Sequence, residues 1–177
     1  MSRIPYQPAD LAEPRNIVDA IRHRRGGHLL NLDRMLLHSP SLARGWNAYL
    51  GEVRTGLAVD ARLREIAMCV VAILNRAEYE FIHHAPELLK AGGSEQQVQA
   101  LRDPVAALTR ADLFDPAELA TIRVTVEMTR DVQVSDDAFV ALRDALGNDR
   151  HVVELIAVAA TYNMVSRFLV ALGVEPE

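Results

Sequence analysis

The stretch "NRAEYEFIHHAPELLKAGG" carries the residues best suited to moving protons, with Glu80 and His84 one helical turn apart. Residues four apart lie on the same face of a helix, where a carboxylate can orient an imidazole ring. On a helical wheel, His84 borders the apolar face formed by Phe81 and Ala85, whereas His83 points about 100° away. We therefore predict that His84 is half-buried in a site and that His83 faces solvent.

A second carboxylate, Glu65, lies on the preceding helical segment among apolar residues such as Met68 and Cys69. A carboxylate in such surroundings needs a partner or must stay protonated. The turn near Asn75 is short, so the two helices should fold back on each other. Glu65 and His84 would then lie about 15 and 12 Å from the turn, at a similar height. The sequence thus predicts a proton-transfer site made of Glu65, Glu80 and His84.

These three residues also have purely structural interpretations. A glutamate and a histidine at this spacing often form a solvated pair that stabilises the helix by a few tenths of a kcal/mol. Glu65 could instead be the ion-pair partner of Arg62 or Arg64. Spacing alone leaves these alternatives open.

Redox and metal chemistry have little support in the residue types. Cys69 is the single cysteine, so no intrachain disulfide or CxxC pair can form. Within "AMCVVAI" it fits a small core residue better than a nucleophile. His83, His84 and Glu80 could in principle bind a metal, but adjacent histidines on a helix diverge too far to share an ion easily. We expect no metal and no cofactor.

Four other positions could contact a ligand. Trp46 and Tyr49 have helical spacing that suits a core, with a ligand platform as the alternative, and Trp46 is kept as a candidate for substrate binding. Asn163 and Arg167 are one turn apart on a long apolar segment. They could bind an anion or simply form structural contacts.

Helix signals recur along the chain, and strand signals do not. No alternating run of β-branched residues is long enough to build a sheet. Ser94 with Gln97 forms a capping box, and Asp115-Pro116 marks a helix start. We predict an all-α fold of about seven to eight helices in a single domain spanning residues 1–177. The helical segments are 15–25, 41–54, 60–74, 77–91, 95–102, one from 116, 136–146 and 150–172.

Composition limits the classes of function. The chain has 177 residues, of which 50% are hydrophobic, and a net charge of −5. The absence of a basic stripe argues against nucleic acid as a partner. The unbroken apolar runs, such as "MCVVAIL", are shorter than the ~20 residues of a membrane span, and the N-terminus lacks the apolar region of a signal peptide. We expect a cytoplasmic protein, and Lys90, the only lysine, indicates a GC-rich bacterial coding sequence.

Three segments together resemble the carboxymuconolactone decarboxylase family, which includes the alkylhydroperoxidase D-like proteins. They are "LLHSPSLARGWNAYLGEV", "VDARLREIAMCVVAILNRAEYEFIHHAPELLKAGGSEQQVQAL" and "VVELIAVAATYNMVSRFL". The resemblance covers roughly residues 28–172. It implies an all-helical alkylhydroperoxidase D-like fold that assembles as a homo-oligomer, a trimer or hexamer, with the site near the subunit contacts.

The peroxidase branch of this family carries the pattern Glu-x11-Cys-x2-Cys-x3-His. Aligned with this chain, its glutamate falls on Glu65 and its histidine on His84, but its cysteines fall on Ala77 and Glu80. Without thiols at those two positions, peroxide reduction through a dithiol is excluded.

The decarboxylase branch, which lacks the cysteine pair, is more similar. The resemblance implies a cofactor-independent lyase acting on a small carboxylated lactone or related acid of aromatic-compound catabolism. His84 would deliver the proton, Glu80 would orient it and Glu65 would support it, while Arg76 or Arg167 would bind the substrate carboxylate. One alternative is a non-catalytic oligomeric binding protein of the same fold. The other is an alkylhydroperoxidase-type antioxidant, which the missing cysteine pair disfavours.

Overall fold

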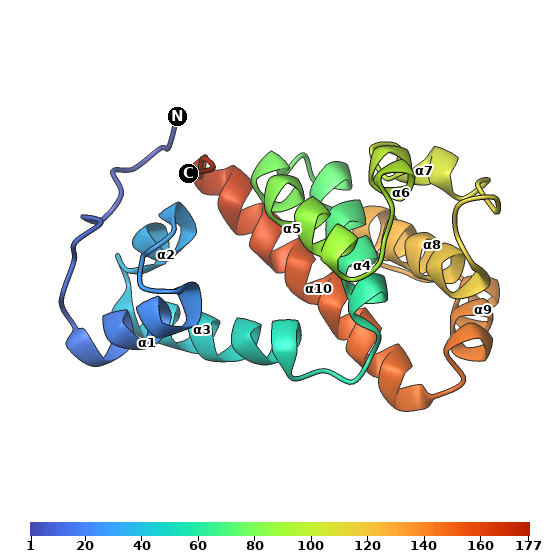
Figure 1. Ribbon diagram of the computed structural model, residues 1–177, viewed down its shortest axis with the longest axis horizontal. Coiled ribbons are helices and arrows are strands. Elements are labelled where there is room, and N and C mark those ends of the chain that lie inside the picture. Colours follow the sequence, from blue (N-terminus) through green and yellow to red (C-terminus); the bar gives the residue numbers. More distant parts are fainter. The chain divides into compact units, whose positions relative to one another are not determined.

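Ten α-helices and no strand make up the computed structural model, which describes all 177 residues (Figure 1). The all-α prediction is confirmed, but the predicted number of seven to eight helices is wrong. The helices are α1 (Arg15–Arg25), α2 (Asn31–Leu36), α3 (Pro40–Thr55), α4 (Ala61–Leu74), α5 (Glu78–Lys90), α6 (Glu95–Ala100), α7 (Pro104–Ala107), α8 (Pro116–Asp131), α9 (Asp136–Leu146) and α10 (Asp149–Leu172).

The two helices missed from the sequence are short. At six and four residues, α2 and α7 contain too little sequence to show a 3.6-residue period. One signal could have found α7, because Asp103 precedes Pro104 just as Asp115 precedes Pro116. The side chain of Asp103 accepts a hydrogen bond from the backbone N–H of Ala106 at 3.1 Å.

Both predicted caps are present, and a further side-chain cap begins α4. Ser94 and Gln97 form the expected reciprocal capping box of α6, and Asp115 caps α8 with Pro116 in its first turn. Asp60 accepts a hydrogen bond from the backbone of Arg62 at 2.7 Å and starts α4. These side chains satisfy backbone N–H groups that have no partner inside the helix.

The chain divides into two compact units, of which the first contains residues 1–57 and 171–177. In this unit α3 packs against α1 and α2, with Trp46 and Leu50 of α3 among the buried side chains. Asp33 is 1% exposed and forms an ion pair with Arg25 at 3.0 Å. The last residues of the chain also belong here, since Glu177 accepts a hydrogen bond from the backbone of Asn31 at 2.6 Å.

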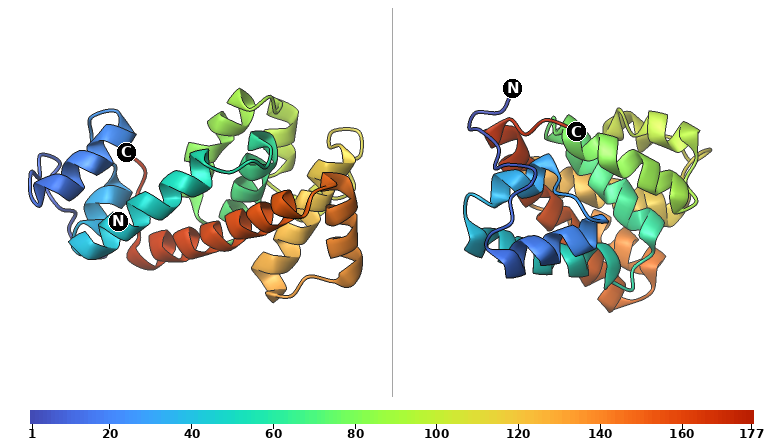
Figure 2. Two further views of the ribbon diagram at one scale, coloured as in Figure 1. Left: turned by 90° about the horizontal axis from the view of Figure 1, so that it is seen from below. Right: turned by 60° about the vertical axis from the view of Figure 1, so that its left-hand side comes forward.

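The second unit, residues 58–170, carries the predicted site. Helix α4 packs against both α5 and α8, and α9 packs on α8 (Figures 1 and 2). The apolar face of α5 and the nearly all-apolar α4 meet in a core to which α6, α7 and α8 also contribute. Its buried members are Ile66, Cys69, Val70, Ala72, Phe81, Leu88, Val98, Leu101, Ala107, Phe114, Ile122 and Val126.

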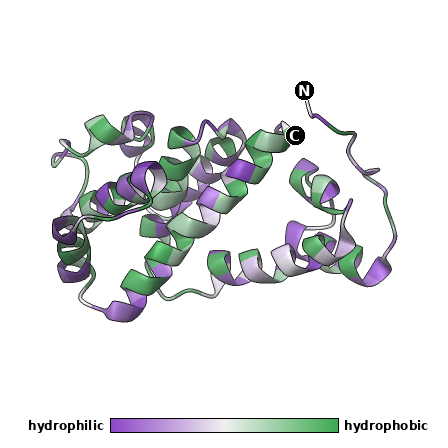
Figure 3. Ribbon diagram, turned by 180° about the vertical axis from the view of Figure 1, so that it is seen from behind, coloured by the Kyte–Doolittle hydropathy of each residue, from purple (hydrophilic) through white to green (hydrophobic).

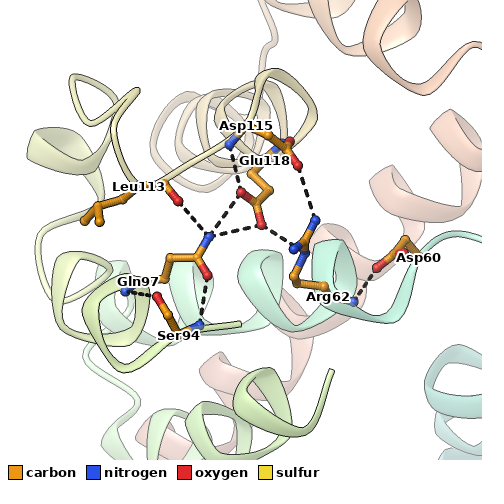
Figure 4. Close-up of polar contacts among 7 residues, drawn as sticks. All are labelled: Asp60, Arg62, Ser94, Gln97, Leu113, Asp115 and Glu118. Carbon is orange, nitrogen blue, oxygen red and sulfur yellow. Dashed lines mark hydrogen bonds and ion pairs between the residues drawn. The ribbon is translucent and has the colours of Figure 1, made fainter. Parts of the chain in front are cut away.

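A buried polar network ties three helices of this unit together (Figure 4). Glu118 of α8 is 2% exposed and accepts hydrogen bonds from Gln97 Nε2 at 3.1 Å and from the Asp115 backbone at 2.8 Å. Arg62 Nε of α4 lies 3.0 Å from the same carboxylate. Because its charge and hydrogen-bonding capacity are satisfied within the protein, this cluster is structural.

Helix α10 is apolar around most of its surface, as its colouring shows (Figure 3). By length and composition alone α10 could cross a membrane. This was missed from the sequence because only uninterrupted apolar runs were considered. Nine of its residues, from Val152 to Leu169, are nevertheless buried in the protein, as in a core helix. Its polar side chains also bind neighbouring helices, as described below.

Candidate functional site

The predicted meeting of Glu65 and His84 is present in the structure. Helix α4 ends at Leu74, and α5 begins at Glu78 after a tight turn in which Arg76 has a φ of 57°. The two helices therefore run antiparallel, and the Glu65 Oε2 atom lies 2.7 Å from His84 Nδ1. The expected equal height of the two side chains is confirmed.

Burial makes this contact chemically distinctive. The side chain of His84 is 4% exposed and that of Glu65 is 16% exposed, so His84 is more buried than the half-buried position predicted. An ionised carboxylate can only accept a hydrogen bond, so in this pair Nδ1 of His84 carries the proton. Nε2 is then the nitrogen that can accept or deliver a proton, and Glu65 favours the charged imidazolium form when Nε2 is protonated.

Glu80 and Tyr162 complete the surroundings of His84. Glu80 lies in the first turn of α5 and is 2% exposed, which the sequence did not predict. Glu65 is the carboxylate bonded to Nδ1, and the orienting role of Glu80 stays a prediction. Side chains on a helix lean towards its N-terminus. The imidazole of His84 lies against α4, where it contacts Glu65.

Tyr162 of α10 was not predicted as a site residue. Its ring meets the His84 ring edge-on, with centroids 4.8 Å apart and an interplanar angle of 87°, and Tyr162 is 1% exposed. Its position as the only tyrosine on a long, largely apolar helix was the signal in the sequence. The rotation of α10 against α5, which brings the two rings together, could not be read from spacing.

His83 diverges from His84 as predicted, although it is partly buried rather than fully in solvent. Its Nδ1 donates to the backbone carbonyl of Tyr79 at 2.7 Å, and its ring stacks on the Tyr79 ring at 4.3 Å. A histidine fixed by its own helix in this way is suited to structure.

Cys69 is a core residue, as the sequence indicated. It is fully buried, and this burial raises the pKa of its thiol well above the usual range. The nearby carboxylates of Glu65 and Glu80 raise the pKa further, while Arg102 opposes them. The neutral thiol that results is a poor nucleophile. No three histidine, cysteine, aspartate or glutamate side chains are placed to hold one metal ion.

The predicted substrate-binding residues are not gathered around His84. Arg76 is exposed at the α4–α5 turn, eight residues and about 12 Å of helix from His84. Arg167 follows Tyr162 by five residues, which places it about 140° further around α10. Trp46 is a buried residue of the first unit, on α3. Their roles in binding a substrate stay predictions.

Solved structures show where this fold occurs. A peroxidase-related protein from Ralstonia eutropha JMP134, described as an alkylhydroperoxidase AhpD core, has a TM-score of 0.83 at 20% identity, covering 99% of this chain and 92% of its own. A peroxidase-related protein from Silicibacter sp. TM1040 has a TM-score of 0.80 at 18% identity, covering 99% and 90%. A variant of the debrominase Bmp8, in complex with 2,3,4-tribromopyrrole, has a TM-score of 0.82 at 15% identity, covering 100% and 94%. At these identities the likeness shows the fold.

A search of curated proteins found no match. Residues 40–127, which include Glu65, Glu80 and His84, match the model of the carboxymuconolactone decarboxylase family. The chain therefore belongs to the carboxymuconolactone decarboxylase family, as a form without the cysteine pair, and its fold is like that of the alkylhydroperoxidase AhpD core.

Proposed function

We propose that this protein is a cofactor-independent carboxy-lyase acting on a small carboxylated lactone or related acid, with His84 as the proton-transfer residue. The observation that carries the proposal is the 2.7 Å contact between Glu65 and Nδ1 of the buried His84. A buried imidazole held by a carboxylate is the arrangement that general acid–base catalysis needs.

The reaction would use the two nitrogens of His84 for different tasks. Loss of CO2 leaves the electron pair of the broken carbon–carbon bond on the substrate, where a conjugated lactone carbonyl delocalises it as a dienolate. Protonated Nε2 of His84 would then deliver its proton to carbon. Glu65 would hold the ring in place and stabilise its imidazolium form, and the buried carboxyl group of Glu80 lies one helical turn before His84.

A screen of carboxylated lactones and related acids for CO2 release tests this function. With a turned-over substrate, His84→Gln should lower the rate by about 10²–10⁴, the usual effect of losing a general acid or base. Glu65→Gln should have an intermediate effect, because it removes the charge and keeps the volume.

The neighbouring histidine supplies a matched control. His83→Gln should change the rate little, since the His83 ring diverges from His84 and donates to the backbone carbonyl of Tyr79. Equal losses at the two histidines would contradict the proposal. Absence of turnover across the screen would favour the alternative of a non-catalytic binding protein of this fold.

Peroxide reduction is the other activity suggested by the related structures, two of which are peroxidase-related proteins. Ala77 and Glu80 stand where the peroxidase pattern has its cysteines, and Cys69 is buried with a raised pKa. These features support the lyase over the antioxidant.

A further inference from the structure

We propose that a pocket on the second unit, between α8 and α10, binds a small monocarboxylate with an apolar body. The pocket has a volume of about 320 Å³. Its lining contains neither Glu65 nor His84, so it is a site separate from the proposed catalytic pair. The lining residues are Met128, Val132, Ala160, Asn163, Met164 and Arg167.

The charged side chain in the lining of this pocket is Arg167, which is held in place by hydrogen bonds to Asn163. Arg167 Nη1 donates to the backbone carbonyl of Asn163 at 2.8 Å and to its side-chain Oδ1 at 2.6 Å. No carboxylate pairs with this guanidinium, which leaves Nε and Nη2 available as two parallel donors. That fork matches the two oxygens of a carboxylate, and its anchoring reduces the entropy lost on binding.

Asn163 is itself fully engaged. Its Oδ1 accepts from Asn75 Nδ2 at 3.0 Å as well as from Arg167, while its Nδ2 donates to Thr129 Oγ1 at 2.9 Å and to the Ala159 carbonyl at 3.0 Å. All four hydrogen-bonding positions of the amide are therefore used within the protein. Arg167 alone is left to recognise a polar group, which specifies a single anion.

The remaining walls are apolar and exposed. Val132 is 82% exposed and Met164 is 42% exposed, and a flexible methionine adapts to ligands of varied shape. Val132 also has a φ of 66°, a conformation that a β-branched residue adopts only at a cost of about 1–3 kcal/mol. Such strain is concentrated at functional sites, and here it falls on a residue that lines the pocket.

Charge separates this pocket from a larger one in the same unit. A cavity of about 570 Å³ is lined by Arg110 together with Glu95 and Asp112. Arg110 is bonded to both carboxylate oxygens of Asp112, at 2.8 and 2.7 Å, so that lining carries net negative charge. The Arg167 pocket has one formal charge, which is positive, on a chain of net charge −5. An anion is therefore attracted to the smaller pocket and repelled by the larger one.

Size further defines the ligand. A water molecule occupies about 30 Å³ in the liquid, so the pocket has room for on the order of ten groups of that size. Benzoate and hexanoate are of this size, and they combine one carboxylate with an apolar body. The volume lies at the lower end of small-molecule sites in proteins.

Calorimetric titration of the full-length protein with benzoate tests the inference, with benzamide as the uncharged match. We expect saturable binding of one benzoate per chain and none of benzamide. Arg167→Gln should weaken binding about 10- to 100-fold, the effect of losing a charged bidentate contact. Arg167→Lys should weaken it less, because it keeps the charge and loses the fork.

Two control variants isolate the pocket. Arg110→Gln removes another exposed arginine, from the other cavity, and should leave benzoate affinity within twofold. His84→Gln should also leave it unchanged, so that failure of the lyase proposal and failure of this one are distinguishable. The inference would be overturned if benzoate and benzamide bound equally, or if Arg167→Gln left the affinity for benzoate unchanged. It would also be overturned if a second chain of an oligomer covered Met164 and no benzoate bound.

Discussion

Replacing Glu65 and His84 by leucine, singly and together, measures how strongly the two side chains depend on each other. Glu65→Leu removes the acceptor from Nδ1 of a ring that is 4% exposed, which should destabilise the fold by about 1–3 kcal/mol. His84→Leu removes the partner of a carboxylate that is 16% exposed, which should cost about 2–3 kcal/mol, less than for a fully buried ion pair.

The double variant is the informative one. Two leucines on facing helices leave no charge without its partner, and such replacements of a buried pair are often neutral or stabilising. We therefore expect the double variant to be more stable than His84→Leu alone, with a coupling energy of about 2–3 kcal/mol. Urea unfolding followed by circular dichroism would measure all four proteins. For a chain of this length, each single change should also lower Tm by about 2–4 °C per kcal/mol.

Additivity would refute this reasoning. If the two single effects sum to the double effect within about 0.5 kcal/mol, the side chains do not interact energetically despite their 2.7 Å separation. The same experiment with His83→Leu in place of His84→Leu is the control, and there we expect no coupling to Glu65.

Three further predictions concern redox chemistry, the buried network and assembly. Because burial raises the pKa of Cys69, a thiol reagent should react with it only after unfolding. No thiol-dependent peroxidase turnover should be measured, and a peroxidase activity abolished by Cys69→Ala would contradict this. The folded thiol stays protonated where the unfolded one ionises, so the free energy of unfolding should fall above about pH 8.5, and Cys69→Ala should remove that component. Gln97→Leu should cost about 1–3 kcal/mol in urea unfolding by removing a donor from the buried Glu118, and unchanged stability would argue against the network. Light scattering should show a trimer or hexamer, in line with exposed apolar residues such as Phe139, rather than a monomer of 19.6 kDa.

The local features of this chain were readable because they depend on residues close in sequence. Eight helices follow from periodicity and from caps such as Ser94 and Asp115. The contact between Glu65 and His84 follows from counting residues on either side of one short turn, since helix rise is constant. Burial of Cys69 follows from its apolar neighbours in the sequence.

What could not be predicted depends on how distant elements pack. Tyr162 is 78 residues from His84, and only the tertiary rotation of α10 brings the two rings into contact. The pocket at Arg167 likewise combines α8 with α10, and its lining includes Val132, whose φ is positive. Arg167 was recognised as an anion-binding candidate from its spacing to Asn163, but its pocket is formed by residues that no periodicity connects.

This chain departs from the peroxidase pattern at the N-terminus of α5, where the two cysteines of that pattern are missing. Helix N-termini stabilise negative charge, and the peroxidase pattern would place its cysteines at positions 77 and 80, in that first turn. Here Ala77 is the buried residue that precedes α5, and the carboxylate of Glu80 lies in the first turn of the helix, 2% exposed. The place that favours a thiolate in the peroxidase pattern therefore holds a carboxylate instead. The exchange removes redox chemistry through sulfur and places a buried acidic group one turn from His84, where Glu65 already fixes the ring. A scaffold altered in this way is suited to moving protons, which is the chemistry that a decarboxylation at carbon requires.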